Sequence, residues 1–203
     1  MGETVAGKRY DRAYFDRWYR GDQRVGSRAA LERKVTLAVA VAEIVLGRPL
    51  RSVLDVGCGE ARWQPVLARL RPRSTYLGID ASAYAVERYG ARRNVRQGSF
   101  EDLHLHVFER PFDLVVCADV LHYLTRPQIV AGLEALVPLV GGVAFLETYT
   151  SGDDIVGDHH DFQKRSASTY RRLFADAGLV HCGMHSWVRA DQVRDLTELE
   201  VCG

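Results

Sequence analysis

The sequence predicts an α/β protein built on a doubly wound, mostly parallel sheet. Apolar, β-branched runs alternate with segments of helical spacing along most of the 203 residues, which is typical of strand–helix–strand units. The first apolar run ends in a glycine turn that leads directly into a helical segment. A hydrophobic content of 47% in a chain of this length predicts one domain with a sizeable core.

The elements are expected in the following order. Residues 10–20 and 31–46 have the spacing of amphipathic helices, and Gly47 and Pro49 end the second. Pro65 requires the helix after the glycine turn to begin late or to kink. The last two strands are expected to form an antiparallel hairpin across residues 189–194. Strands are predicted over residues 53–56, 75–80, 94–97, 112–117, 142–149, 179–188 and 196–202, and further helices over 61–70, 82–90, 128–139 and 167–177.

Four aromatic side chains share one face of the first predicted helix: Tyr14, Phe15, Trp18 and Tyr19. Such a face must cover something apolar, either the edge of the sheet or a ligand beneath a lid. We divide the chain into an N-terminal helical cap or lid, residues 1–48, and one compact main domain, residues 49–203.

Charge and cysteine usage give no sign of a polyanionic or membrane partner. The formal net charge is +1, and no apolar run approaches the length of a membrane span. The four cysteines are scattered, without a Cys-x-x-Cys pair, as expected of reduced thiols. We expect a cytoplasmic protein, monomer or homodimer, that binds neither nucleic acid nor membrane.

The glycine turn that follows residues 53–56 predicts a ligand site. Gly57 and Gly59 allow positive φ angles and a close approach of ligand to backbone. A dinucleotide-binding turn would have a third glycine where this chain has Arg62, so a pyrophosphate is disfavoured. Asp55 also suits an ammonium group or water better than a phosphate. An adenosine cofactor smaller than a dinucleotide fits better.

Asp80 ends the second predicted strand, 21 residues beyond Gly59. Nucleoside sites in α/β sheets place an acid there against the ribose, because a carboxylate accepts hydrogen bonds from both hydroxyls. The alternative is an acid that caps the next helix.

Residues 54–59, Leu-Asp-Val-Gly-Cys-Gly, closely resemble the first motif of class I (Rossmann-like) S-adenosylmethionine-dependent methyltransferases. The resemblance is specific from about residue 51 to residue 149. It implies a seven-stranded sheet and S-adenosylmethionine as cofactor, and it implies that the cofactor contacts Asp55, Gly57, Cys58, Gly59, Asp80 and Ala81.

Two further segments resemble motifs of that family. Residues 97–103 correspond to the adenine region, where this chain has Ser99 in place of the usual acid. Either Ser99 makes a weaker bond, or Glu101 or Asp102 reaches the adenine, with Phe100 as an apolar wall. Residues 118–124 correspond to the fourth motif, which implies that Asp119 lies along the methionine moiety of the cofactor.

Histidines supply the candidate bases. His122 is either a base or a structural histidine that fixes its loop. His159 and His160, flanked by acids in the loop of residues 148–162, are the best candidates for proton removal, because carboxylates raise the pKa of a neighbouring imidazole. The same acids and histidines have no known metal-ligand spacing, and we expect no metal.

The predicted function is methyl transfer from S-adenosylmethionine to oxygen or nitrogen of a small organic acceptor, with Tyr14, Trp18 and Tyr149 in the acceptor pocket. Arginines and aromatic residues near the N-terminus favour a carboxylate or a phenol. A non-catalytic module that binds the cofactor for a partner and a protein methyltransferase are the alternatives. A nicotinamide oxidoreductase is disfavoured by Arg62.

Overall fold

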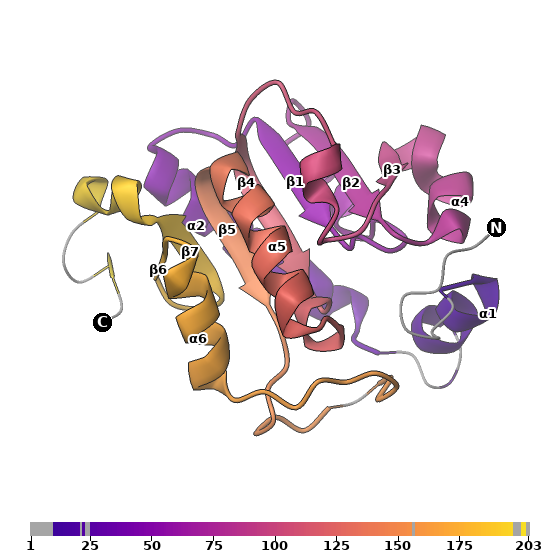
Figure 1. Ribbon diagram of the computed structural model, residues 1–203. Coiled ribbons are helices and arrows are strands. Elements are labelled where there is room, and N and C mark those ends of the chain that lie inside the picture. The colour runs from indigo at the N-terminus through magenta and orange to yellow at the C-terminus, as the bar shows by residue number, and fades with distance from the viewer. Residues whose placement is uncertain (1–9, 21, 23–24, 156, 197–199, 202–203) are drawn as a thin grey trace.

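The computed structural model describes residues 10–20, 22, 25–155, 157–196 and 200–201, and it contains a seven-stranded sheet (Figure 1). The strand order is β3-β2-β1-β4-β5-β7-β6, and all neighbours are parallel except β5–β7 and β7–β6. This confirms the predicted doubly wound, mostly parallel sheet. The strands are β1 (Ser52–Val56), β2 (Thr75–Asp80), β3 (Val95–Gln97), β4 (Phe112–Ala118), β5 (Val140–Glu147), β6 (Leu179–His181) and β7 (Ser186–Arg189).

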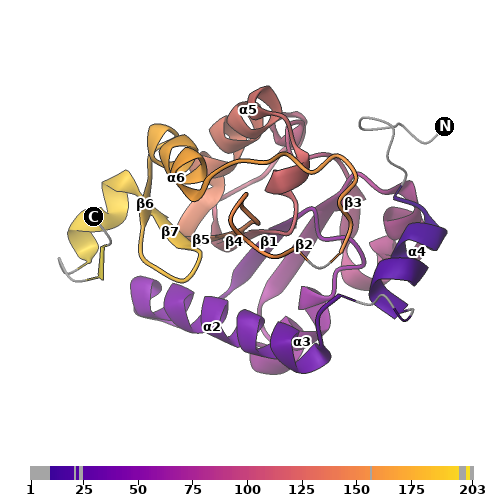
Figure 2. The same cartoon turned by 90° about the horizontal axis from the view of Figure 1, so that it is seen from below.

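Helices cover both faces of the sheet, as Figure 2 shows. On one face lie α2 (Arg28–Leu46), α3 (Trp63–Leu70) and α4 (Ala83–Arg93), and on the other α5 (Arg126–Leu136) and α6 (Ala167–Asp176). Alternate residues of β1 serve the two layers: Val53 packs with the first set of helices, and Leu54 and Val56 pack with the second. All five residues of β1 are buried, as expected for a central parallel strand.

Capping residues explain where several helices begin and end. α3 begins at Trp63, so Pro65 falls in the first turn, where no helical hydrogen bond is lost. The Ser82 side chain accepts a hydrogen bond from the amide of Ala85 and so caps α4. This helix runs past Gly90 and ends where Asn94 takes a left-handed conformation with φ +54°.

The C-terminal hairpin differs from the prediction. The single strand expected over residues 179–188 is two antiparallel strands, β6 and β7, joined by a turn in which Gly183, Met184 and His185 all have positive φ. The alternation of side chains hid this turn because only the glycine signals it. The last predicted strand, residues 196–202, is not found at residues 196, 200 and 201, which are the part of it that the structure describes.

The N-terminal segment packs against the carboxyl end of the sheet. It consists of α1 (Arg12–Phe15) and a π-helical turn, Asp16–Arg20. The Arg20 guanidinium pairs with Glu60 of the glycine turn, and the Ser82 hydroxyl donates to the carbonyl of Tyr10 at 2.5 Å. The boundary predicted at residue 48 stays a prediction. Helix α2 lies before that boundary and contributes Val35 and other buried residues to the core of the sheet.

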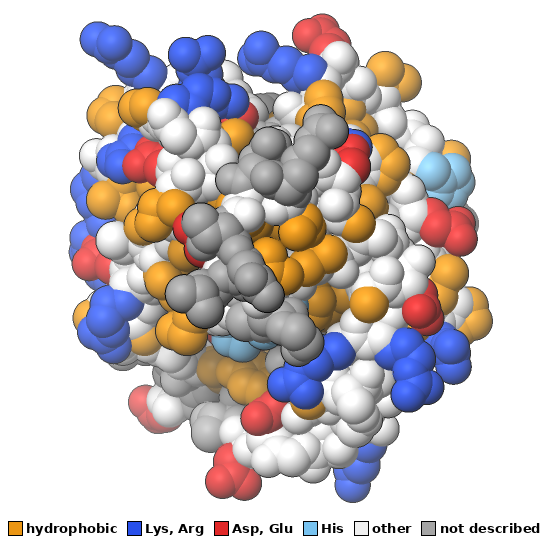
Figure 3. All heavy atoms as spheres, turned by 90° about the vertical axis from the view of Figure 1, so that its left-hand side faces the viewer, with side chains coloured by type: hydrophobic (Ala, Val, Ile, Leu, Met, Phe, Trp, Pro, Cys, Tyr) orange, Lys and Arg blue, Asp and Glu red, His pale blue; other side chains and the backbone are white. Residues whose placement is uncertain are grey.

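Basic side chains on the face seen in Figure 3 occur in separate groups, with acidic side chains close to several of them. Among the described residues, no helix combines the length and the apolar character needed to cross a membrane.

Candidate functional site

The carboxyl ends of the parallel strands bring the candidate residues to one edge of the sheet. Gly57 follows β1, Asp80 ends β2, and Asp119 follows β4. The strand order reverses between β1 and β4, and open α/β sheets bind ligands at that crevice. Two adjoining cavities lie there.

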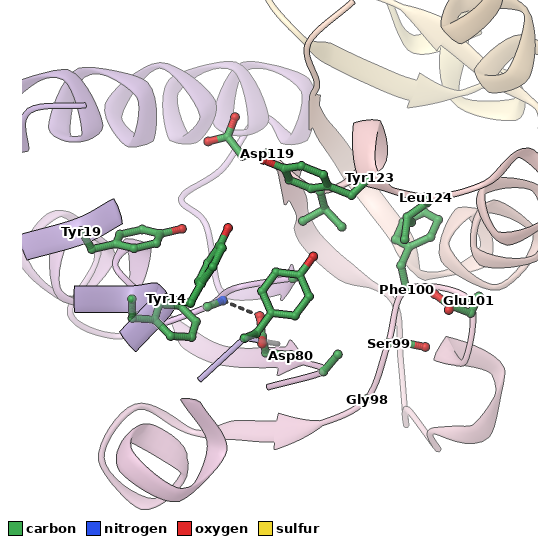
Figure 4. A pocket seen from close by; sticks show the side chains of 16 residues that line it. Tyr14, Tyr19, Asp80, Gly98, Ser99, Phe100, Glu101, Asp119, Tyr123 and Leu124 are labelled. Atoms are coloured by element: carbon green, nitrogen blue, oxygen red, sulfur yellow. Dashed lines mark hydrogen bonds between the residues drawn. The ribbon is translucent and has the colours of Figure 1, made fainter. Parts of the chain in front are cut away.

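The first cavity, here called the Asp80 chamber, encloses about 710 Å³ of empty space, part of which is open to solvent. In Figure 4, Tyr14 and Tyr19 of the N-terminal segment lie across it from Tyr123, which follows β4. The N-terminal segment therefore forms one wall of the cavity, as a lid would. Its lining consists of Tyr10, Tyr14, Phe15, Tyr19, Gly57, Gly59, Asp80, Ala81, Gly98, Ser99, Phe100, Glu101, Asp119, Val120, Tyr123 and Leu124.

Backbone amides fix the Asp80 carboxylate. One oxygen accepts a hydrogen bond from Gly59 N at 2.6 Å, and the other accepts one from Ser82 N at 2.8 Å. Burial raises the pKa of Asp80, and the two amides oppose that rise. A carboxylate has about four acceptor positions, so each oxygen keeps capacity for one further donor. Two vicinal hydroxyls match this arrangement.

Close neighbours leave little or no space for a side chain at the glycines of the turn. Gly57 has φ +72°, and a Cβ there would lie 2.2 Å from Cγ2 of Val120. Gly59 has φ +53°, and a Cβ there would lie 3.2 Å from Cε1 of Phe15. Both positions combine a left-handed backbone with close neighbours, which only glycine accommodates.

The adenine region contains one unpartnered carboxylate oxygen. The Ser99 hydroxyl donates to Asp102 at 2.7 Å, so these two side chains partner each other. Glu101 accepts a hydrogen bond from Gln128 at 2.7 Å through Oε1, whereas its Oε2 is buried without a partner among the described residues. Of the three alternatives that the sequence left open, Glu101 therefore has an acceptor atom that still needs a donor.

A second cavity, here called the His122 chamber, has a volume of about 590 Å³. It shares Tyr14, Tyr19, Asp119 and Tyr123 with the Asp80 chamber, so the two cavities adjoin at these side chains. Its lining consists of Tyr14, Trp18, Tyr19, Val25, Arg62, Asp119, His122, Tyr123, Tyr149, Ile155, Gly157 and Asp158.

His122 is almost fully buried, with 1% of its surface exposed. Its ring centroid lies 4.1 Å from that of Tyr123, 5.4 Å from that of Tyr149 and 5.5 Å from that of Phe162. Nδ1 lies 3.3 Å from the Thr148 hydroxyl oxygen, and the amide of Tyr149 donates to it at 3.5 Å. Packing and polar contacts at Nδ1 thus fix the ring orientation.

Asp119 lies at the boundary of the two chambers and has a positive φ of +62°. Its carboxylate is 3.9 Å from the Lys34 ammonium group, which also pairs with Glu147. Desolvation, and to a lesser extent Glu147, raises the pKa of Asp119 to about 6, and Lys34 limits the rise.

Four predicted site residues lie away from both chambers. His159 and His160 are exposed, and His160 pairs with Asp161 at 2.9 Å instead of facing a cavity. Asp55 is buried and accepts a hydrogen bond from the Tyr76 hydroxyl at 2.7 Å, and Cys58 is likewise absent from both linings. Burial raises the pKa of Asp55 to about 7. Among the described residues, no group of His, Cys, Asp or Glu is arranged to hold a metal ion.

The lining side chains that sequence reasoning missed as ligand candidates include Tyr10, Arg62 and Tyr123. Tyr123 lies next to His122 in the fourth motif, and its hydroxyl donates to the carbonyl of Asp158 at 2.9 Å. Its position directly after a strand of the predicted sheet was the available signal. The sequence analysis considered Arg62 only because it stands where a dinucleotide-binding turn would have its third glycine.

The fold is a doubly wound α/β sheet with two adjoining cavities at the carboxyl ends of its strands, and comparisons with known proteins show what the chain is similar to. A model of the methyltransferase domain matches residues 54–141. Trans-aconitate 2-methyltransferase of Deinococcus radiodurans is 34% identical over 110 residues, which cover 52% of this chain and 41% of that protein. The match thus spans less than half the length of that relative.

Solved structures show the same fold. An O-methyltransferase of neocarzinostatin biosynthesis, in complex with S-adenosyl-L-homocysteine and 1,4-dihydroxy-2-naphthoic acid, has a TM-score of 0.55 and 22% identity, covering 79% of this chain and 57% of that chain. The sugar N-methyltransferase KedS8 of a Streptoalloteichus species has a TM-score of 0.60 and 18% identity, covering 73% and 79%. The chain is thus similar in sequence to methyltransferase domains over residues 54–141, and it shares the fold of these solved methyltransferases.

Proposed function

We propose that the protein is an enzyme that transfers a methyl group from S-adenosylmethionine to oxygen or nitrogen of a small organic acceptor. The observation that carries this proposal is the pair of adjoining chambers, of which one suits an adenosine and the other is aromatic and contains a histidine. The curated relative and the solved structures, which are named for methyl transfer to small molecules, support it.

The residues of the Asp80 chamber fit the cofactor. The Asp80 carboxylate accepts the ribose hydroxyls, Glu101 Oε2 accepts the adenine amino group, and Phe100 forms an apolar wall. Gly57 and Gly59 line this chamber together with Asp119, beside which the methionine moiety would lie. When bound, the cofactor supplies an activated sulfonium methyl group.

The protein's own part in this reaction is alignment, exclusion of water and handling of a proton. Aromatic side chains of the N-terminal segment and of residues 123 and 149 enclose the His122 chamber and keep water out. Acceptance from the Tyr149 amide by Nδ1 places the proton of a neutral ring on Nε2, whereas a base that acts through Nε2 requires the other tautomer, with Nδ1 donating to the Thr148 hydroxyl. We propose His122 as the base for a protic acceptor because it is a histidine that lines this chamber.

Calorimetric titration with S-adenosylmethionine, S-adenosylhomocysteine and NADH tests the cofactor, and transfer of a labelled methyl group to a panel of small acids, phenols and amines tests catalysis. We expect saturable binding of the first two ligands, no binding of NADH, and turnover of at least one acceptor class. Binding of the cofactor with transfer to protein substrates only would contradict a small acceptor. Binding without any transfer would favour a regulatory module.

A further inference from the structure

Arg62 is placed to bind a ligand in the His122 chamber. It precedes α3, directly after the glycine turn, and its side chain is half-buried in the lining of this chamber. The guanidinium carbon lies 5.3 Å from the centre of the Tyr19 ring. The side chain is therefore held against an aromatic wall that both chambers share.

No carboxylate among the described residues pairs with Arg62, in contrast to Arg20 and Lys34 at the same edge of the sheet. Arg20 pairs with Asp16 and Glu60, and Lys34 pairs with Glu147 and approaches Asp119. A guanidinium group has five N–H donors, and contact with an aromatic face satisfies none of them in a directional way. With only this contact among the described residues, the guanidinium group keeps its N–H donors for water or for an acceptor in the chamber.

The acids that line the same chamber already have other partners. The Asp119 carboxylate lies beside Lys34, and the Asp158 carboxylate accepts a hydrogen bond from the amide of His160 at 2.9 Å. A planar oxyanion that enters the chamber matches the fork of donors on a guanidinium group, and a carboxylate makes two parallel hydrogen bonds with it. We propose that Arg62 binds a carboxylate of the ligand that occupies the His122 chamber.

This inference rests on the proposed function, which offers two sources of the same chemical group. The methionine moiety of the cofactor carries a carboxylate, and a cofactor whose adenosine is held in the Asp80 chamber would place that carboxylate near the side chains that both chambers share. The acceptor is the second source if it is itself an acid. In both cases Arg62 contributes directional recognition that a lysine would not reproduce.

The experiment compares the wild-type protein with Arg62→Met and Arg62→Lys by calorimetric titration. The probes are S-adenosylhomocysteine, which carries the carboxylate, and 5′-methylthioadenosine, which keeps the adenosine and the sulfur but lacks it. The acids trans-aconitate and trans-cinnamate are then titrated into protein saturated with S-adenosylhomocysteine. Arg73→Met is the matched control. Arg73 is exposed on the turn before β2, at the end of that strand opposite to Asp80 and the site.

We expect Arg62→Met to lower the affinity for a carboxylate-bearing probe roughly tenfold or more, in keeping with the loss of a charged hydrogen bond. Arg62→Lys should recover part of that loss, and 5′-methylthioadenosine should bind all variants equally, which also confirms that they fold. Weaker S-adenosylhomocysteine binding assigns Arg62 to the cofactor carboxylate. Weaker binding of an acid alone assigns it to the acceptor.

Unchanged binding of S-adenosylhomocysteine together with no Arg62-dependent binding of either acid would overturn the inference. A wild-type protein that binds no S-adenosylhomocysteine would instead contradict the proposed function, so the two failures are distinguishable.

Discussion

The two chambers of the site are held in place by different means. Strand ends and backbone amides build the Asp80 chamber, in which Gly59 and Ser82 fix the Asp80 carboxylate. The His122 chamber is assembled from the N-terminal segment and from the loops after β4 and β5, whose aromatic rings pack on one another. The sheet thus determines the base of the first chamber, although the N-terminal segment forms one of its walls, whereas contacts between distant segments determine most of the second.

This difference indicates which part of the site suits a shared cofactor and which part selects the acceptor. A chamber formed by strand ends is fixed by the fold and suits a cofactor common to a family. A chamber formed by loops and a terminal segment varies without loss of the sheet, and it suits an acceptor that differs from protein to protein. Variants on the two sides should therefore affect different measurements.

The largest effect is expected from Asp80→Ala. Loss of two hydrogen bonds to a charged group, at about 1.5–3 kcal/mol each, should weaken S-adenosylhomocysteine binding about 100-fold or more. Because Asp80 also accepts two backbone N–H groups, thermal or urea unfolding should show a lower stability. Asp102→Ala is the control, since Asp102 lies nearby but does not line the chamber. Equal affinity in wild type and Asp80→Ala would remove the ribose assignment.

His122→Phe should affect the His122 chamber, and therefore turnover more than cofactor binding. The substitution keeps an aromatic ring in the cluster with Tyr123 and Tyr149 but removes the titratable nitrogen atoms. For a protic acceptor we expect kcat to fall roughly 100-fold, the usual contribution of a general base, while S-adenosylhomocysteine affinity changes less than about twofold. Steady-state kinetics and calorimetry on the same preparation measure both. A normal kcat would make His122 a structural histidine.

Glu101→Gln tests the contact between Glu101 and the adenine of the cofactor, and a smaller effect is expected. The unpartnered Oε2 should select an amino group, so the wild-type protein should prefer S-adenosylhomocysteine to its inosine analogue roughly tenfold. An amide at residue 101 presents a donor as well as an acceptor, and the preference should shrink or reverse. Competition binding measures the ratio. An unchanged preference would mean that Glu101 does not contact the base.

Asp55→Asn should change only the pH dependence of stability. The folded-state pKa of Asp55, raised to about 7 by burial, exceeds the ordinary value near 4, so the folded state binds more protons between these two pH values. The free energy of unfolding should therefore fall as pH rises from about 4 to about 7. Urea titrations across that range should give a flatter profile for the Asn variant. Parallel profiles would contradict the assignment to Asp55.

The parts of the molecule that short-range pattern dictates could be predicted from the sequence. The central strand β1, the glycine turn and the acid that ends β2 each combine local propensity with a fixed place in the fold, and all three lie where the sequence puts them. The Ser82 cap of α4 was predictable for the same reason.

The parts that depend on distant contacts could not be predicted. His159 and His160 have acidic neighbours in sequence, yet the path of their loop leaves them exposed while buried His122 lines the chamber. Arg62 is informative only once its neighbours are known, because an unpartnered cation is a property of the folded chain. The hairpin between β6 and β7 was not predicted, because the alternating residues on both sides of the turn read as one continuous strand and a single glycine marks the turn.

A crystal structure of the protein with S-adenosylhomocysteine tests most directly the division of the site into two chambers. We predict that the ribose bonds to Asp80 and the adenine amino group to Glu101, with the sulfur atom near Asp119 and Tyr123 at the shared wall and the His122 chamber open to an acceptor. A ligand whose adenosine occupies the His122 chamber, or whose sulfur lies far from the shared wall, would contradict the account.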